Sequence, residues 1–177
     1  MRKINTKFKD LFIIKSKVFF DNRGFFRETF KNKPIKKNLV FGCSSKSRKN
    51  VLRGLHLQNR KSQGKFITVL KGEIFDVAVD LRKNSKTFGK VFKIILSQRN
   101  ALGLFIPGGF AHAYYSYEKE NVIYYKLDNY YSPRFESGIF YNDKEIRVKW
   151  PRKKMLISKK DRKLKSFEEF KRKFKSL

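Results

Sequence analysis

Apolar and polar residues alternate along much of this chain, and a period of two is typical of strands that bury one face. Turns rich in Gly, Pro, Asn and Asp separate the alternating runs, and a helical period is almost absent between residues 50 and 150. Many short strands separated by turns predict an all-β antiparallel sandwich or barrel of the jelly-roll kind. We expect strands at 11–14, 18–20, 65–70, 73–81, 91–97, 102–106, 110–115 and 122–127.

The connections between the predicted strands are short. The stretches 31–38 and 44–49 are polar and predict surface connections, and neither is long enough to join two domains. Turn residues occur at 21–24, and a Lys-Gly pair ending at Gly72 predicts a hairpin between the strands on either side. The whole chain, residues 1–177, is expected to form a single jelly-roll domain.

Strict alternation assigns side chains to faces in two of the predicted strands. Phe75 and Val77 share one face, so Asp76 points to the other, where it meets solvent or lines a polar interior. Tyr125 shares a face with the apolar Ile123 and is therefore expected to point inward.

The end of the chain breaks the strand pattern. Ser166 and Glu169 have the spacing of a capping box, acidic residues come early and basic residues late, and Phe167, Phe170 and Phe174 recur three and four residues apart. This pattern predicts a short helix that packs its aromatic stripe on the sheet. Such a stripe is more typical of a core contact than of membrane binding.

The composition fits a folded domain. The 177 residues are 40% apolar and 16% aromatic, which is enough hydrophobic surface for a core. No apolar run approaches the roughly 20 residues that a membrane helix needs, and no apolar secretory segment follows Met1. A single cysteine, Cys43, excludes an intrachain disulfide, so we expect a reducing, cytoplasmic location.

The charge balance is strongly basic. There are 44 Lys and Arg against 15 Asp and Glu, a formal net charge of +29 that attracts anions over long range. The lysines are spread over the whole chain and form no basic arm or recognition motif, which argues against specific nucleic-acid binding. A solvated basic surface, or a small anionic substrate such as a nucleotide sugar, fits the distribution better.

The candidate chemistry centres on the stretch 50–58, where His56 lies near the fixed cation Arg53. The chain has only two histidines, His56 and His112, and no His-x-His pair, whereas a metal centre in a small β-barrel normally needs three or more nearby ligands. Motifs for a serine nucleophile, a phosphate loop or a dinucleotide are also missing. Acid–base chemistry remains, with His56 as base and Tyr125 as acid, and the alternative is a purely structural histidine.

One geometric condition attaches to this hypothesis. Strict alternation places Arg53 and His56 on opposite faces of their strand, which would separate them. A β-bulge at Gly54 would bring both to one side, and glycine is the residue that permits it.

The chain resembles the dTDP-4-dehydrorhamnose 3,5-epimerase family over nearly its full length. The segments that carry the resemblance, in chain order, are Arg23-Gly24-Phe25-Phe26-x-Glu28, Val51-Leu52-Arg53-Gly54-Leu55-His56-x-Gln58, Gln63-Gly64-Lys65, Asp76-Val77-Ala78-Val79-Asp80, Ser85-Lys86-Thr87-Phe88-Gly89, Pro107-x-Gly109-Phe110-Ala111-His112, Tyr125-Lys126, Asn129-Tyr130-Tyr131-Ser132-Pro133, Asn142-Asp143, Trp150-Pro151 and Ser158-x-Lys160-Asp161.

The resemblance implies a cupin-type jelly roll that works as a homodimer on a nucleotide sugar, without a metal or other cofactor. It makes His56 the proton acceptor, Asp161 the carboxylate that orients it, and Tyr125 the proton donor on the opposite face of the sugar. Arg53 and Lys65 would lie near the keto oxygen and the diphosphate. The further substrate-contacting positions that it implies are Arg23, Glu28, His112, Tyr131, Glu136 and Lys160.

Two departures from the family pattern leave the substrate open. Where the family usually has Gln and Asn, this chain has Phe41 and Cys43, which removes amide hydrogen-bonding groups from the pocket edge. The alternatives are therefore an epimerase for another nucleotide-linked keto sugar or for one carbon only, a 3,4-ketoisomerase, or a non-catalytic jelly-roll module that binds a sugar or nucleic acid.

Overall fold

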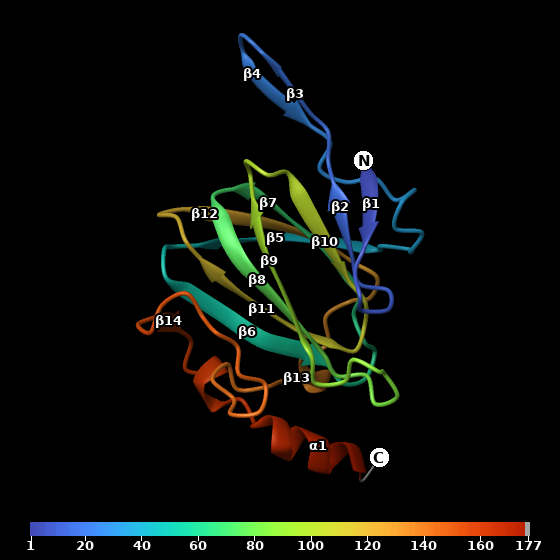
Figure 1. The fold of residues 1–177 in the computed structure, drawn as a ribbon, viewed down its shortest axis with the longest axis vertical. Helices are drawn as coiled ribbons and strands as arrows, with labels where there is room; N and C mark the ends of the chain where they lie inside the picture. Colours follow the sequence, from blue (N-terminus) through green and yellow to red (C-terminus); the bar gives the residue numbers. More distant parts are fainter. Residues whose placement is uncertain (176–177) are drawn as a thin grey trace.

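The computed structural model describes residues 1–175, with side chains to residue 172, as two facing antiparallel sheets and a projecting hairpin (Figure 1). The strands of the first sheet, in spatial order, are β1 (Arg2–Asn5), β2 (Phe12–Lys15), β10 (Leu102–Ile106), β7 (Lys65–Lys71), β12 (Asn121–Leu127) and β5 (Phe41–Ser47). Those of the second are β13 (Glu136–Gly138), β6 (Val51–Gln58), β11 (Phe110–Ser116), β8 (Glu73–Asp80) and β9 (Val91–Ser97), with β14 (Leu156–Ile157) beside β6. The hairpin is β3 (Val18–Asp21) and β4 (Gly24–Arg27).

The main core lies between the two sheets, and the predicted all-β jelly roll is confirmed. Ile67 and Ile123 from the first sheet pack in one cluster with Ile74 and Leu96 from the second, and all four are fully buried. The outer faces are also covered. A cluster from residues 30–39 packs on the first sheet, and a cluster that includes the C-terminal helix packs on the second.

Two connections predicted from the sequence are wrong. The strands on either side of Gly72 form no hairpin, because β7 pairs with β10 and β12 whereas β8 pairs with β11 and β9. The chain passes from one sheet to the other at Gly72, whose φ is +84°. The polar stretch 44–49 is a strand as far as Ser47, because β12 supplies hydrogen-bond partners that composition alone does not reveal.

The predicted faces are confirmed. Tyr125 packs against the main core beside Ile123, and Asp76 is fully buried on the inner face of β8. The alternative of a solvent-facing Asp76 is therefore excluded, because strand β8 is covered on both faces.

The predicted C-terminal helix is also confirmed as α1 (Phe167–Lys175). Its capping box is formed: the Ser166 N–H donates to Glu169 at 2.7 Å, and the Glu169 N–H donates to Ser166 Oγ at 3.2 Å. Phe167 and Phe170 are buried against the second sheet, while the side chain of Phe174 lies outside those described. No helix within residues 1–175 is long and apolar enough to cross a membrane.

The loop between β8 and β9 is organised around a buried carboxylate. Asp80 accepts hydrogen bonds from Arg82 Nε at 2.9 Å and Nη2 at 2.7 Å, and from the hydroxyls of Ser85 and Thr87 at 2.6 Å each. Burial by itself would raise the pKa of Asp80, but these hydrogen bonds outweigh it and lower the pKa to about 2. The ionised carboxylate therefore stabilises the folded state.

Replacing Asp80 with Asn is expected to lower the free energy of unfolding by about 2 kcal/mol or more at neutral pH. The folded-state pKa is depressed, so the contribution is complete above the ordinary pKa and is lost as the pH falls towards 2. Urea unfolding at several pH values measures this. The control is Asp10→Asn, whose side chain is 60% exposed and 3.9 Å from Arg82. Equal effects of the two substitutions would contradict the prediction.

Candidate active site

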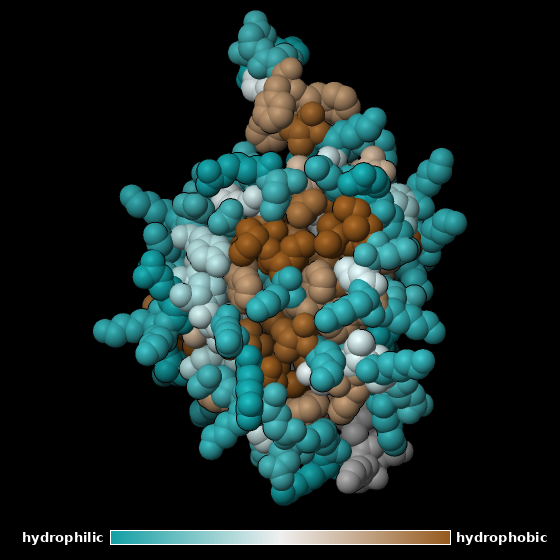
Figure 2. Space-filling model, in the orientation of Figure 1, coloured by the Kyte–Doolittle hydropathy of each residue, from teal (hydrophilic) through white to brown (hydrophobic). Residues whose placement is uncertain are grey.

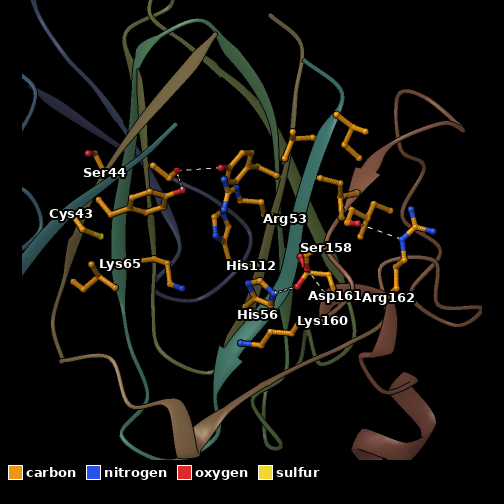
Figure 3. A pocket seen from close by; sticks show the side chains of 18 residues that line it. Cys43, Ser44, Arg53, His56, Lys65, His112, Ser158, Lys160, Asp161 and Arg162 are labelled. Atoms are coloured by element: carbon orange, nitrogen blue, oxygen red, sulfur yellow. Dashed lines mark hydrogen bonds and ion pairs between the residues drawn. The ribbon is translucent and has the colours of Figure 1, made fainter. Parts of the chain in front are cut away.

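A cavity of about 690 Å³ opens between the two sheets at the end that carries β5, β6 and β12 (Figure 3). Its walls come from both sheets and from the segment that follows β14. The cavity brings together seven of the side chains singled out from the sequence: Arg53, His56, Lys65, His112, Tyr125, Lys160 and Asp161.

The bulge predicted at Gly54 is present. On β11, His112 lies opposite His56 and Tyr114 lies opposite Arg53, so two steps on β11 face three steps on β6. Gly54 has φ +116°, and a Cβ at this position would lie 2.4 Å from the carbonyl oxygen of His112. Only glycine fits, and the extra residue places Arg53 and His56 on the wall of one cavity.

Asp161 forms hydrogen bonds with both the side chain of His56 and the backbone of the bulge. Its Oδ1 lies 2.8 Å from His56 Nε2, and its Oδ2 accepts the N–H of Gly54 at 3.3 Å. Ser158 Oγ in turn accepts the N–H of Asp161 at 3.0 Å, which fixes the start of η2 (Asp161–Lys163). Burial alone would raise the pKa of Asp161, but the hydrogen bond and charge of His56 and the Gly54 N–H lower it overall.

This arrangement determines which nitrogen of the His56 imidazole carries the hydrogen. An ionised carboxylate only accepts hydrogen bonds, so His56 Nε2 carries the hydrogen when the ring is neutral. Nδ1 is then the basic nitrogen. The His56 side chain is 33% exposed, whereas Asp161 is almost fully buried behind it.

A second histidine–carboxylate pair lies deeper in the same cavity wall. His112 Nε2 is 2.9 Å from Asp76 Oδ2, and both side chains are buried. The other oxygen of Asp76, Oδ1, is buried without a hydrogen-bond partner among the described residues. His112 is thus held from behind by a carboxylate whose position the alternation of β8 fixes.

The first sheet contributes the polar side chains of Tyr125 and Lys65 to the cavity wall. Burial, and next the neighbouring Tyr114, raise the pKa of Tyr125 well above 10, so its hydroxyl is protonated at neutral pH. Burial lowers the pKa of Lys65, and Asp76 is the largest influence in the opposite direction. The site therefore presents a neutral acid beside a partly desolvated cation.

The four predicted residues that do not line the cavity are Glu136, Tyr131, Arg23 and Glu28, and the first two lie near Lys160, which does. Lys160 Nζ is 2.5 Å from Glu136 Oε2, and the hydroxyl of Tyr131 donates to the same oxygen. Arg23 and Glu28 do not reach the cavity of their own chain. Arg23 is at the tip of the hairpin, 2.7 Å from Asp21, and Glu28 pairs with Lys31.

Sequence reasoning missed several polar groups near the site. Ser45 and Ser47 belong to the stretch 44–49, for which the polar composition predicts a connection, although they alternate with Cys43 in the way that a strand requires. Tyr114, which alternates with His112 on β11, is also at the cavity. Within residues 1–175, no three His, Cys, Asp or Glu side chains are grouped closely enough to hold a metal ion.

The fold and the cavity define a cupin-like jelly roll whose binding site carries acid–base and cationic groups. The family described as dTDP-4-dehydrorhamnose 3,5-epimerase matches residues 5–169. The enzyme of that name from Methanothermobacter thermautotrophicus is 42% identical over 176 aligned residues, which cover 95% of each chain. The Shigella flexneri enzyme of that name is 45% identical over 168 residues, which cover 91% of this chain and 93% of the relative.

A solved structure agrees in fold and in sequence. The dTDP-6-deoxy-D-glucose-3,5-epimerase from Legionella pneumophila, in complex with dTDP-4-keto-L-rhamnose, superposes with a TM-score of 0.89. It is 40% identical, and the match covers 93% of this chain and 92% of that one. The chain belongs to the dTDP-4-dehydrorhamnose 3,5-epimerase family, a family of isomerases.

Replacing Gly54 with Ala is expected to lower the free energy of unfolding by more than about 2 kcal/mol, because of the positive φ and the contact with His112. The matched control is Gly42→Ala on β5, where an added Cβ meets only ordinary contacts at 3.5 Å or more and the effect stays below about 1 kcal/mol. Urea unfolding of both variants provides the measurement. Similar stabilities for the two variants would show that the bulge tolerates a side chain.

Proposed function

We propose that this protein converts dTDP-4-dehydro-6-deoxyglucose to dTDP-4-dehydrorhamnose by inverting C3 and C5 through proton transfer alone. The observation that carries the proposal is the placement of His56, backed by Asp161, and of Tyr125 on the walls of one cavity. The names of the relatives, and the dTDP-4-keto-L-rhamnose bound by the Legionella enzyme, support the choice of substrate.

His56 acts as the base. The C4 carbonyl makes the hydrogens on C3 and C5 acidic, and His56 Nδ1 takes one of them. Asp161 stabilises the imidazolium that results, because its carboxylate lies 2.8 Å from Nε2 and is held in the ionised form. The electrons of the broken C–H bond move to the C4 oxygen as an enolate.

Tyr125 acts as the acid from the other sheet. It remains protonated at neutral pH, and so it can return a proton to the carbon from the face opposite His56. The C–H bond forms, the C4 carbonyl is restored, and the configuration of the carbon is inverted. No metal or organic cofactor takes part in this sequence of steps.

Cations supply the electrostatic part of the mechanism. Arg53 and Lys65 line the cavity and would stabilise the enolate oxygen and the diphosphate. His112, fixed by Asp76, would contact the sugar, and Lys160 at the rim would contact the substrate together with Glu136 and Tyr131. The net charge of +29 draws a dianionic nucleotide sugar towards the protein.

A homodimer completes the proposal. The hairpin projects from the body of the molecule (Figure 1), and apolar surface gathers on it (Figure 2). Its four phenylalanines, Phe19, Phe20, Phe25 and Phe26, are each at least 50% exposed. A two-stranded hairpin with apolar side chains on both faces is marginal in water and needs a partner surface. A second copy would cover it, and Arg23 and Glu28 would then serve the pocket of that copy. We expect the dimer to work in the cytoplasm.

A second candidate is an epimerase for another nucleotide-linked keto sugar, or for one carbon only. The observation that favours it is the cavity edge, where Cys43 contributes a thiol and Phe41 packs near Tyr130 with ring centroids 6.2 Å apart. These side chains recognise less polar groups than amides would.

The first test follows hydrogen exchange from solvent D₂O into dTDP-4-dehydro-6-deoxyglucose by NMR. We expect deuterium at both C3 and C5 of an epimerised product, and a fall in turnover of about 10²- to 10⁴-fold in His56→Ala and in Tyr125→Phe. Tyr124→Phe is the control, because its ring points to the other face of β12 and turnover should be unchanged.

Each alternative predicts a different spectrum. Deuterium at one carbon identifies an epimerase that acts there only, and a carbonyl moved to C3 identifies a ketoisomerase. Binding without exchange, equal in the parent and in His56→Ala, identifies a binding module. Exchange only with another nucleotide-linked keto sugar would contradict the proposed substrate.

The second test asks whether two copies share each site. Sedimentation should give twice the monomer mass of 21.2 kDa. Mixed and reassociated Arg23→Ala and His56→Ala proteins should recover about a quarter of the parent activity, because half of the random pairs contain one intact site. No recovery, although mixed dimers form, would show that Arg23 does not serve the partner's pocket.

A further inference from the structure

Four hydroxyl groups form a continuous line behind the cavity. The hydroxyl of Tyr125 lies 3.2 Å from Ser45 Oγ, which lies 3.2 Å from the hydroxyl of Tyr114. The Tyr114 hydroxyl lies 2.9 Å from Ser47 Oγ, and Arg53 Nε donates to Ser47 Oγ at 3.1 Å.

The last member of the line permits hydrogen bonds that all run in one direction, from Ser47 to Tyr125. A guanidinium donates hydrogen bonds and accepts none, so Ser47 accepts from Arg53 and has its own hydrogen left for Tyr114. Tyr114 can then donate to Ser45, and Ser45 to Tyr125. Tyr125 becomes an acceptor, and its own hydrogen is left free to point into the cavity.

The pattern of the strands produces this line. Ser45 and Ser47 are two residues apart on β5 and therefore share a face, next to Tyr125 on the paired strand β12. Tyr114 comes from β11 of the opposite sheet and joins the two serines across the sandwich. Ser47 and Tyr114 are buried, so water does not compete with the contact between these two hydroxyls.

We propose that the line Ser45–Tyr114–Ser47, directed by Arg53, positions the Tyr125 O–H towards the sugar, and that Ser45 at its end stabilises the phenolate that remains when the proton has been given up. The inference rests on the proposed epimerase function. In the step concerned, the O–H bond of Tyr125 breaks, its electron pair stays on the phenolic oxygen, and the proton forms a C–H bond with the electron pair of the enolate. His56 and Tyr125 exchange their protons with solvent between turnovers.

The need for such a line comes from burial. A phenolate in the position of Tyr125 loses most of its hydration, which is why burial raises its pKa. The hydroxyl of Ser45, 3.2 Å from that of Tyr125, is a hydrogen-bond partner that favours the ionised form. Hydrogen bonds to a charged group are stronger than those between neutral groups, and a line of them polarises each member in turn.

The test separates proton removal from proton return. In Ser45→Ala and in Tyr114→Phe, His56 is intact and should still exchange substrate hydrogens with D₂O. Inversion should fall by about ten- to a hundredfold, because the acid and its phenolate lose a hydrogen bond to a charged group. The ratio of exchange without inversion to epimerisation therefore rises. A merely structural role would lower both rates together and leave the ratio unchanged.

Two control variants complete the experiment. Ser45→Thr keeps a hydroxyl and should restore the parent ratio. Tyr124→Phe removes a tyrosine hydroxyl from the same strand and should leave the ratio at the parent value. Ser45 is only partly buried, so Ser45→Ala provides the answer if Tyr114→Phe fails to fold. A parent ratio in folded Ser45→Ala overturns the role of the line, whereas no exchange by the parent protein with any nucleotide keto sugar overturns the proposed function and this inference with it.

Discussion

The arrangement of the site depends on one extra residue in strand β6. The bulge takes the Gly54 N–H out of the regular ladder, and Asp161 accepts it with one oxygen while the other oxygen holds His56. The Asp161 carboxylate thus holds the bulge at Gly54 in place. It also holds the side chain of His56, which the bulge directs into the cavity. Because a Cβ at Gly54 would collide with β11, the fold accepts only glycine there, and the sequence Arg53-Gly54-Leu55-His56 is determined by geometry as well as by chemistry.

The two sheets divide the proposed chemistry between them. The base and its carboxylate belong to the second sheet and the segment after it, whereas Tyr125 and Lys65 belong to the first. Their separation is set by the core that keeps the sheets apart, and such cores resist deformation. The contacts of Tyr114 with Ser45 and Ser47 add a polar connection at the cavity itself. A stable distance between base and acid is what inversion of a bound sugar requires.

The sequence predicts much of this fold because most strands alternate cleanly. The faces of Asp76 and Tyr125, the bulge at Gly54 and the capping box of Ser166 all follow from local rules, and the structure has each of them. Strand pairing does not follow from local rules. A lysine-glycine turn before Glu73 looks like a hairpin whether the next strand joins the same sheet or the opposite one, and only long-range packing decides.

The same limit applies to the site. Ser45 and Ser47 are small polar residues in a basic stretch, and nothing local distinguishes them from a loop. Their partner Tyr114 is 67 residues away from Ser47 and lies in the other sheet. Arg23 and Glu28 are recognisable only by resemblance, because one chain leaves them outside its own cavity. Residues whose partners lie in another sheet carry no local signature.

Three departures from ordinary packing rules lie at or directly behind the cavity. Asp76 is buried with an oxygen unpaired among the described residues, Lys65 is a desolvated cation, and Tyr125 is an acid whose ionised form is disfavoured. Each costs stability that apolar residues at these positions would not. Asp80, an equally buried carboxylate away from the cavity, is fully paired and stabilises its loop. The contrast is what the proposed function leads one to expect, since the same fold satisfies a buried carboxylate completely in the loop after β8 and leaves polar groups incompletely satisfied at the cavity.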